Sequence, residues 1–83
     1  MKNLNDISED LTLMLLYLHS WREKGFEDSY PRSWKGYDFN TLKALNEKEY
    51  VLDNRKAKSV HITDEGIEEA KKLFQKYGID LEK

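Results

Sequence analysis

The sequence predicts a small α+β domain with the order helix, loop, helix, two-stranded β-hairpin, helix. Three observations support this prediction. Apolar residues recur at helical spacing in three separate segments. A short alternating stretch with a basic turn separates the last two of these segments, as a hairpin requires. Residues that cap helices precede each helical segment. We expect residues 1–83 to form one domain, with 1–5 and 80–83 loosely held.

Composition restricts the classes of protein that this chain can represent. It contains no cysteine, which excludes disulfides and thiolate metal sites. The longest apolar run, Leu13–Leu18, is far shorter than the roughly 20 residues that span a bilayer, and no signal-peptide pattern is present. We therefore expect a soluble, cytoplasmic protein with no membrane partner, no cofactor and no small-molecule ligand.

Charge is distributed unevenly along the chain. The formal net charge is -2, yet residues 32–58 carry seven basic and four acidic side chains, whereas the segments on either side are acidic. A basic region is the electrostatic signature of nucleic-acid binding, although this excess is modest. The central third is therefore where we expect a nucleic-acid partner to bind.

The first helix is predicted from about Ile7 to Lys24. Asp6 would be its N-cap and Glu9 would complete a capping box, and Gly25 would end it in a left-handed cap. One apolar stripe along this helix comprises Leu11, Met14, Leu15, Leu18 and Trp21.

A second apolar side on the same helix needs its own covering. It is formed by Leu13, Leu16 and Tyr17. Either the C-terminal helix covers these residues, or a second copy of the chain does, which would make the protein a homodimer. The pattern leaves both alternatives open.

The segment Phe26–Gly36 is predicted to be irregular, a loop or a single turn, because Pro31 blocks a helix and no period is visible. We expect Trp34 and Tyr30 to fill the core, since so small a core can hardly spare large aromatic residues. The alternative is a platform on which nucleic-acid bases stack, made from Arg32, Lys35, Trp34 and Tyr37.

The second helix is predicted over residues 39–48, with Asp38 as its N-cap. Phe39, Leu42 and Leu45 fall on one side and are expected to be buried. The residues that remain outward or lateral are Asn40, Thr41, Lys43, Ala44, Glu47 and Lys48. This mixture suits a face that reads a DNA groove, and it equally suits a solvated face.

The hairpin is predicted from strands Tyr50–Asp53 and Lys58–Ile62, with Val60 and Ile62 packing inward against Leu52. Glu49 stands where a glycine would suit the turn, so it either accepts strain or the turn differs. Basic residues at the tip, within 54–58, could straddle a phosphate backbone or could deter edge-to-edge pairing of the strands.

The last helix begins at Thr63, which we predict to be its N-cap, with acidic residues in the first turn. Gly66 would permit close packing against the hairpin, and Gly78 followed by Ile79 is typical of a Schellman ending. The predicted buried stripe comprises Ile67, Ala70, Leu73, Phe74 and Tyr77.

No pattern indicates catalysis, so we expect a protein that is not an enzyme. His19 and His61 lie among apolar residues, and no metalloprotease motif, phosphate-binding loop or nucleophile elbow is present. The acidic residues of the last helix fit a solvated surface, and we expect no metal site.

The stretch Leu42–Ala70, with its helix end, hairpin and capped helix, resembles a winged-helix domain. The longer segment SWKGYDFNTLKALNEKEYVLDNRKAKSVHITDEG resembles that of a family of small uncharacterised bacterial and phage proteins with this predicted core. One departure is the missing helix between the first helix and the helix over 39–48.

Winged-helix transcriptional regulators bind DNA through the second helix and the hairpin, and the resemblance implies the same here. We carry this over to Lys35, Asn40, Thr41, Lys43, Arg55, Lys56 and Lys58. The function predicted is DNA binding, as in a transcriptional regulator. The alternative is a protein-interaction or dimerisation module on the same scaffold.

Overall fold

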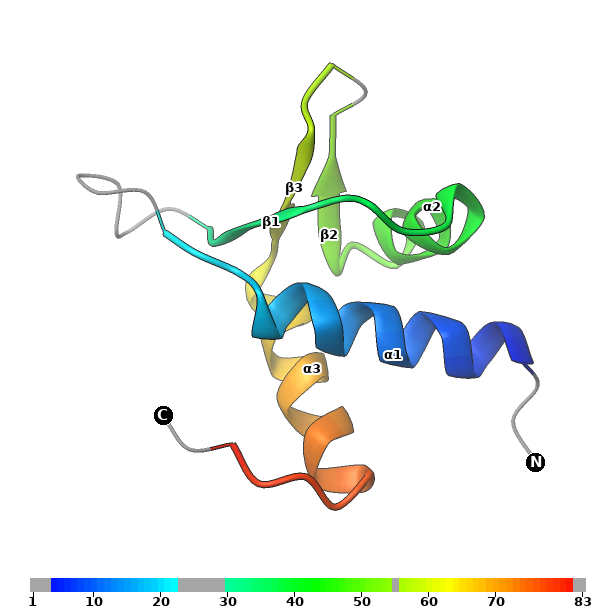
Figure 1. Ribbon diagram of the computed structural model, residues 1–83, viewed down its shortest axis with the longest axis vertical. Coiled ribbons are helices and arrows are strands. Elements are labelled where there is room, and N and C mark those ends of the chain that lie inside the picture. Colours follow the sequence, from blue (N-terminus) through cyan, green and yellow to red (C-terminus); the bar gives the residue numbers. More distant parts are fainter. Residues whose placement is uncertain (1–3, 23–29, 55, 82–83) are drawn as a thin grey trace.

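The computed structural model describes residues 4–22, 30–54 and 56–81. Three helices and a three-stranded antiparallel sheet make a small α+β domain, which confirms the predicted fold class. The elements in chain order are α1 (Leu4–Leu18), β1 (Arg32–Trp34), α2 (Phe39–Glu47), β2 (Val51–Asp53), β3 (Ser59–Ile62) and α3 (Asp64–Lys76). In Figure 1 the β2–β3 hairpin projects at one end, α3 lies at the other end, and α1 crosses between them.

The sheet has the strand order β1-β3-β2, so β1 extends the predicted hairpin by one strand. Strand β1 pairs with β3 so that Arg32 lies opposite His61 and Trp34 lies opposite Ser59. The sequence-based prediction of a loop or turn here was therefore wrong in part. Pro31 does exclude a helix, but the three residues after it find their partners in a strand far along the chain.

Helix α1 begins and ends earlier than predicted. It already includes Leu4 and Asn5, so Asp6 lies in its first turn and is not its N-cap. It ends at Leu18, and Trp21 forms an isolated antiparallel bridge with Arg32. Pairing with β1 therefore replaces the last turns that were predicted for this helix. The predicted cap at Gly25 lies outside the described residues.

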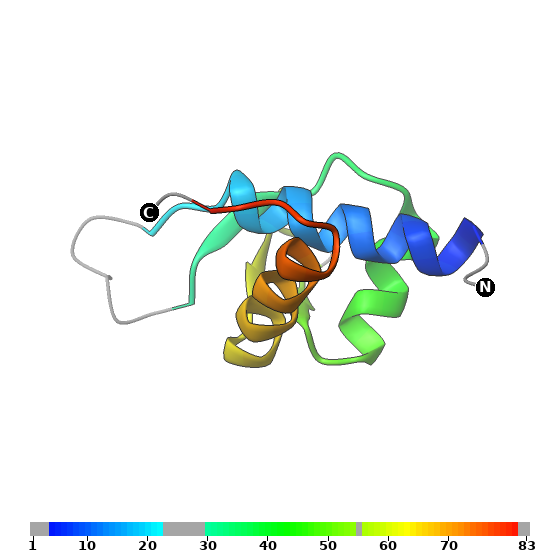
Figure 2. The same cartoon turned by 90° about the horizontal axis from the view of Figure 1, so that it is seen from below.

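The second apolar side of α1 is covered by the chain's own helices. Leu13 and Leu16 are fully buried, and the ring of Tyr17 lies 6.2 Å from that of Phe74 on α3. Of the two alternatives left open by the sequence, the covering by the C-terminal helix is the one observed, and these three residues need no second copy to cover them. Figure 2, which shows the molecule from below, shows α3 crossing next to α1. The predicted stripe is instead exposed at Leu11, Leu15 and Leu18, and only Met14 of it is buried within the helix.

Helix α2 starts where the sequence predicts, because the Asp38 carboxylate accepts a hydrogen bond from the Thr41 backbone N–H at 3.0 Å. Leu42 and Leu45 are buried, as expected. Phe39, the first residue of α2, is not buried, with 66% of its surface exposed. After α2, Glu49 has a φ of +64°, so it accepts the left-handed conformation that a glycine would adopt without strain.

The hairpin turns its fully buried apolar side chains to one face. Val60 and Ile62 on β3 are fully buried, as predicted, but the β2 residue buried with them is Val51, opposite Ile62, and not Leu52. Strand β2 begins one residue later than predicted, and Leu52 alternates to the opposite face, where it is 47% exposed. The prediction was thus one residue out of step in β2, which exchanges the inward and outward side chains of that strand.

Helix α3 and its two ends follow the prediction closely. The Thr63 hydroxyl accepts from the Gly66 N–H at 3.0 Å and donates to the carbonyl of Glu49 at 2.6 Å, which joins the helix to the hairpin. A Cβ on Gly66 would lie 2.0 Å from the Tyr50 carbonyl oxygen, so only glycine fits there. Gly78 at φ +72° and the bond from Ile79 N–H to the Phe74 carbonyl complete a Schellman ending.

The core lies between the sheet and the three helices. Its fully or nearly fully buried side chains are Leu13, Met14, Leu16, Leu42, Leu45, Val51, Val60, Ile62, Ala70, Leu73 and Phe74. Of the residues predicted for the buried stripe of the last helix, Ile67 is only partly buried and Tyr77 is exposed. Across the described ranges, the helices are too short or too polar to cross a membrane.

Candidate nucleic-acid interface

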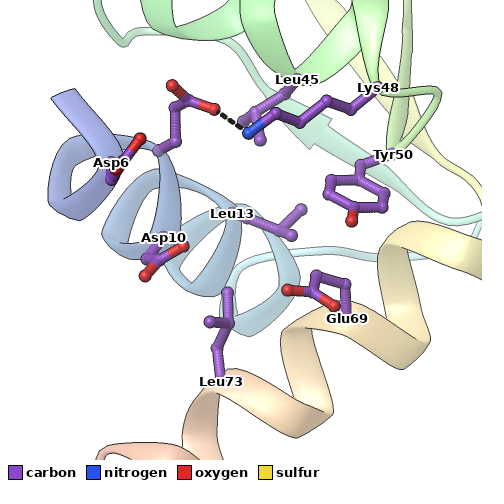
Figure 3. Close-up of a pocket in the computed structure, with 9 residues that line it drawn as sticks. Asp6, Asp10, Leu13, Leu45, Lys48, Tyr50, Glu69 and Leu73 are labelled. Carbon is purple, nitrogen blue, oxygen red and sulfur yellow. Dashed lines mark hydrogen bonds and ion pairs between the residues drawn. The ribbon is translucent and has the colours of Figure 1, made fainter. Parts of the chain in front are cut away.

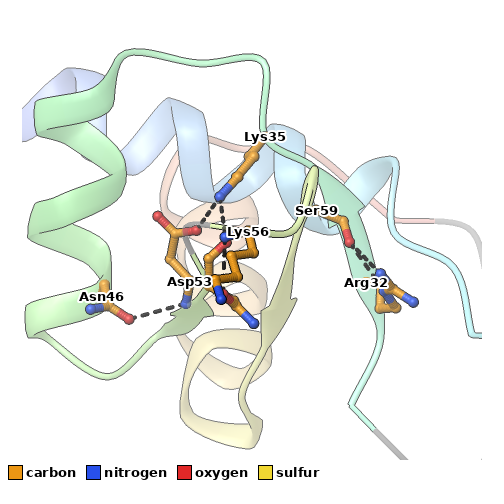
Figure 4. A network of polar contacts seen from close by, with 7 residues as sticks. Arg32, Lys35, Asn46, Asp53, Lys56 and Ser59 are labelled. Carbon is orange, nitrogen blue, oxygen red and sulfur yellow. Dashed lines mark hydrogen bonds and ion pairs between the residues drawn. The ribbon is translucent and has the colours of Figure 1, made fainter.

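A polar network joins the base of the hairpin to its neighbours. The Lys35 ammonium donates to the Asp53 carboxylate at 2.6 Å and to the Asn54 carbonyl at 2.8 Å (Figure 4). The Asn46 side chain on α2 accepts from the Asp53 backbone N–H at 3.2 Å. Because Lys35 and Asp53 each expose less than a fifth of their side chains, this pair is shielded from solvent. The hairpin is thus held at a fixed angle to α2.

The hairpin turn is closed by Asn54. Its carbonyl accepts from the Ala57 N–H at 2.9 Å, and its side-chain oxygen accepts from the Lys56 N–H at 3.0 Å. The side chains of Lys56 and Lys58 are exposed, and neither forms an ion pair with a described residue. Arg55, which was predicted as a phosphate contact, lies outside the described residues.

Helix α2 presents a mixed outer face. Asn40, Lys43 and Glu47 are exposed, and Lys43 forms no ion pair with any residue in the described ranges. Thr41 is half-buried, and its hydroxyl donates to the Asp38 carboxylate at 3.2 Å. Of the seven predicted contacts, Lys35 and Thr41 therefore serve the fold.

An open apolar groove of about 540 Å³ runs between the first turn of α2 and the hairpin base. Its lining residues are Lys35, Tyr37, Phe39, Leu42 and Asp53. The groove separates the two elements that were predicted to contact DNA, and the Lys35–Asp53 pair forms its hairpin side. The exposure of Phe39 at this groove was not anticipated from its helical spacing.

The two tryptophans form a feature that sequence reasoning placed wrongly. Trp34 is 62% exposed and Tyr30 is 39% exposed, so neither fills the core as predicted. Trp34 instead lies against Trp21, with the ring centroids 5.0 Å apart and the planes tilted by 41°. The signal that could have revealed this is the alternation of Arg32, Ser33 and Trp34, of which only the middle residue is buried.

A second pocket, of about 250 Å³, lies where the three helices meet (Figure 3). Asp6, Glu9, Asp10 and Glu69 line it together with Lys48, Tyr50 and three leucines. The Lys48 ammonium lies 2.5 Å from Glu9, and this hydrogen bond raises the pKa of Lys48 above its usual value. Within the described part of the chain, no three acidic or histidine side chains are arranged so that they could hold a metal ion together. The pocket surrounds the ion pair between Lys48 and Glu9, which connects the end of α2 to α1.

Comparison with known proteins finds relatives of unknown function. Residues 5–80 match the family model described as "Domain of unknown function (DUF6429)". A relative from Sinorhizobium fredii (strain NBRC 101917 / NGR234), "Uncharacterized protein y4hR", is 33% identical over 72 residues, which cover 86% of this chain and 88% of the relative. No solved structure matches.

Proposed function

We propose that this chain, which belongs to the DUF6429 family of domains of unknown function, is a small DNA-binding protein of the winged-helix type, such as a transcriptional regulator. Helix α2 lies near the major groove, and the tip of the β2–β3 hairpin lies on the phosphate backbone.

The observation that carries the proposal is the fixed arrangement of α2 and the hairpin. Asp53 is neutralised by Lys35 at the base of the hairpin, so this carboxylate does not oppose the lysines at the tip. Lys56 and Lys58 at the tip and Lys43 on α2 remain exposed. Long basic side chains that project from a rigid support are suited to phosphate contacts, which position a protein on a duplex.

Two polar residues of α2 provide the chemistry for reading bases. Asn40 is exposed, and an asparagine can bond adenine through two hydrogen bonds. Glu47 is exposed on the same helix and would repel phosphate unless it accepts from a cytosine amine. The proposal therefore expects tighter but less selective binding for Glu47→Gln.

The test is a fluorescence anisotropy titration of the protein with mixed-sequence duplex DNA over a range of salt concentrations. We expect the logarithm of affinity to fall linearly with the logarithm of salt concentration. The double variant Lys56→Ala/Lys58→Ala should bind all duplexes more weakly, with a salt slope smaller by about 1 for each lysine removed.

The matched control is Lys71→Ala/Lys72→Ala, which removes two exposed lysines from α3. These lie on the helix at the opposite end from the hairpin, so duplex affinity should hardly change (Figure 1). No binding at low salt, or equal losses in both double variants, would contradict the proposal.

A second candidate function, self-association, is favoured by one observation on α1. Leu4, Leu11, Leu15 and Leu18 all expose 40% or more of their surface, and their spacing puts them on one stripe. Ser8 and Thr12 stand between them, so this stripe carries no charge that would repel its own copy. We propose that two chains pair antiparallel through these leucines, in place of Leu13, Leu16 and Tyr17.

Light scattering over a range of protein concentrations tests this pairing. Leu15→Lys should shift the molecular mass towards that of a monomer, because it places a charge in the middle of the stripe. Leu52→Lys, a change at an equally exposed leucine on the sheet, should leave the mass unchanged. A wild-type protein that is monomeric at every concentration would exclude the dimer.

A further inference from the structure

The outer face of the sheet carries a set of side chains that the proposed contacts do not use. Because neighbouring residues of a strand point to opposite faces, the burial of Ser33, Val51, Val60 and Ile62 defines the inner face. The outward positions are Arg32, Trp34, Leu52, Ser59 and His61. Register places Arg32, His61 and Leu52 side by side across the three strands. No carboxylate occupies any of these positions.

An aromatic ledge stands at one end of this row. Trp21 pairs with Arg32 in the isolated bridge, which brings its ring to 5.0 Å from that of Trp34. The Trp34 ring is supported on one side by Trp21, while 62% of the residue's surface is exposed. A large aromatic ring held in this way offers a flat, apolar surface at little cost in conformational entropy.

A cation is held on the same face, next to the ledge. The Arg32 guanidinium donates two hydrogen bonds to the Ser59 hydroxyl, from Nε at 3.1 Å and from Nη2 at 2.7 Å (Figure 4). These bonds keep the guanidinium against the sheet and cover Ser59, which is 2% exposed.

We propose that this outer face, the surface of Trp21, Arg32, Trp34, His61 and Leu52, binds single-stranded nucleic acid by stacking an unpaired base on Trp34. The combination of exposed π surface with fixed positive charge matches a ligand that carries flat rings along a polyanionic chain. A proline-rich peptide would use the aromatic rings alone, and charge complementarity favours the polyanion. The site is separate from α2, so the proposal does not rest on duplex binding.

Tryptophan fluorescence provides a selective readout, because the chain has two tryptophans and both belong to the ledge. We expect a thymidine oligonucleotide to quench this fluorescence in a saturable way. An oligonucleotide of the same length with abasic sites has the same phosphates without bases, and it should quench far less. A uridine oligonucleotide should quench about as well as thymidine if the site does not distinguish RNA from DNA.

The variant Trp34→Leu keeps an apolar side chain but removes the stacking surface. Its affinity for a fluorescein-labelled thymidine oligonucleotide should fall by about 5- to 150-fold, the range for loss of one stacked base. Lys43→Ala on α2 should leave this affinity unchanged while it weakens duplex binding. The two variants thus separate failure of this site from failure of the proposed function. Circular dichroism confirms that each variant is folded.

Three results would overturn the proposal. The first is equal quenching by the abasic and thymidine oligonucleotides, because the contact would then be electrostatic only. The second is unchanged affinity in Trp34→Leu. The third is saturable quenching by a proline-rich peptide with none by thymidine, which would assign the face to a protein ligand.

Discussion

The two faces of the three-stranded sheet are made by alternate residues of the same short strands, yet they have different surroundings. On the inner face, Val51, Val60 and Ile62 are fully buried against the helices. On the outer face, Leu52 and Trp34 remain 47% and 62% exposed. Both faces contain large apolar side chains, but only the inner face removes them from water.

This difference separates stability from function. Burial of apolar surface stabilises the fold roughly in proportion to the area removed from water, so the inner residues account for most of what the sheet contributes. Trp34 is the largest side chain of the sheet and contributes little of its area to that term. Its exposed ring is therefore available for the stacking contact that we propose.

The largest expected effect is on the free energy of unfolding, when an alanine substitution on the inner face of the sheet is compared with one on the outer face. Ile62→Ala on the inner face should lower the free energy of unfolding by about 2–5 kcal/mol, because it leaves a cavity in a small core. Leu52→Ala on the outer face should lower it by less than about 1 kcal/mol. Urea unfolding followed by circular dichroism measures both. Equal losses of unfolding free energy in the two variants would show that the outer face is also covered in solution, and that the two faces do not differ in burial.

The second prediction concerns the contact between the inner side of the hairpin and α3. Gly66→Ala places a methyl group against the Tyr50 carbonyl and near the Ile62 side chain, so the helix or the hairpin must shift. We expect a loss of about 1–3 kcal/mol, although alanine is the better helix former. The measurement is the urea midpoint.

The control for this substitution is Gly36→Ala. A Cβ there meets no atom within 4 Å, and the backbone is not left-handed. We therefore expect stability to be unchanged or raised by up to about 1 kcal/mol. A Gly66→Ala protein as stable as this control would mean that α3 is not held closely to the hairpin.

The features that could be predicted from the sequence are those encoded by neighbouring residues. The caps at Asp38 and Thr63, the glycine at 78 and the turn of the hairpin depend on contacts within a few positions of the chain. Such local signals are sufficient for the α+β class and for the order of its elements.

The features that could not be predicted depend on residues far apart. Strand β1 has three residues and no period of its own, and it exists because β3 pairs with it. Trp34 was placed in the core because its size favours burial, but the strand register turns it outward. Lys35 was a candidate DNA contact because it is basic, whereas its partner Asp53 lies 18 positions away.

The third prediction sharpens the contrast at the outer face. Trp34→Ala removes the contact with Trp21 but little buried area, so we expect a loss of only about 1 kcal/mol, within the range for one aromatic pair. Thermal unfolding by circular dichroism measures it. A loss as large as that of Ile62→Ala would mean that Trp34 belongs to the core, and would count against a binding role.

The smallest expected effect lies away from the sheet, at the ion pair between Lys48 on α2 and Glu9 on α1. More than half of the Lys48 side chain is exposed, so solvent and salt screen the pair. Lys48→Met should therefore cost no more than about 0.5 kcal/mol at neutral pH and low salt. Lys72→Met, a change at an exposed lysine on α3, is the control and should cost less.

The pH dependence of this pair has a definite sign. Its hydrogen bond to Glu9 raises the pKa of Lys48 above its ordinary value of 10.5, so the folded state binds this proton more tightly than the unfolded state does. The stabilisation is complete below that value and is lost as the pH rises through the higher pKa of the folded protein. The difference in unfolding free energy between the wild type and Lys48→Met should thus shrink in strongly alkaline solution. A difference that stays constant as the pH rises would show that Lys48 stabilises the junction by packing and not by its charge.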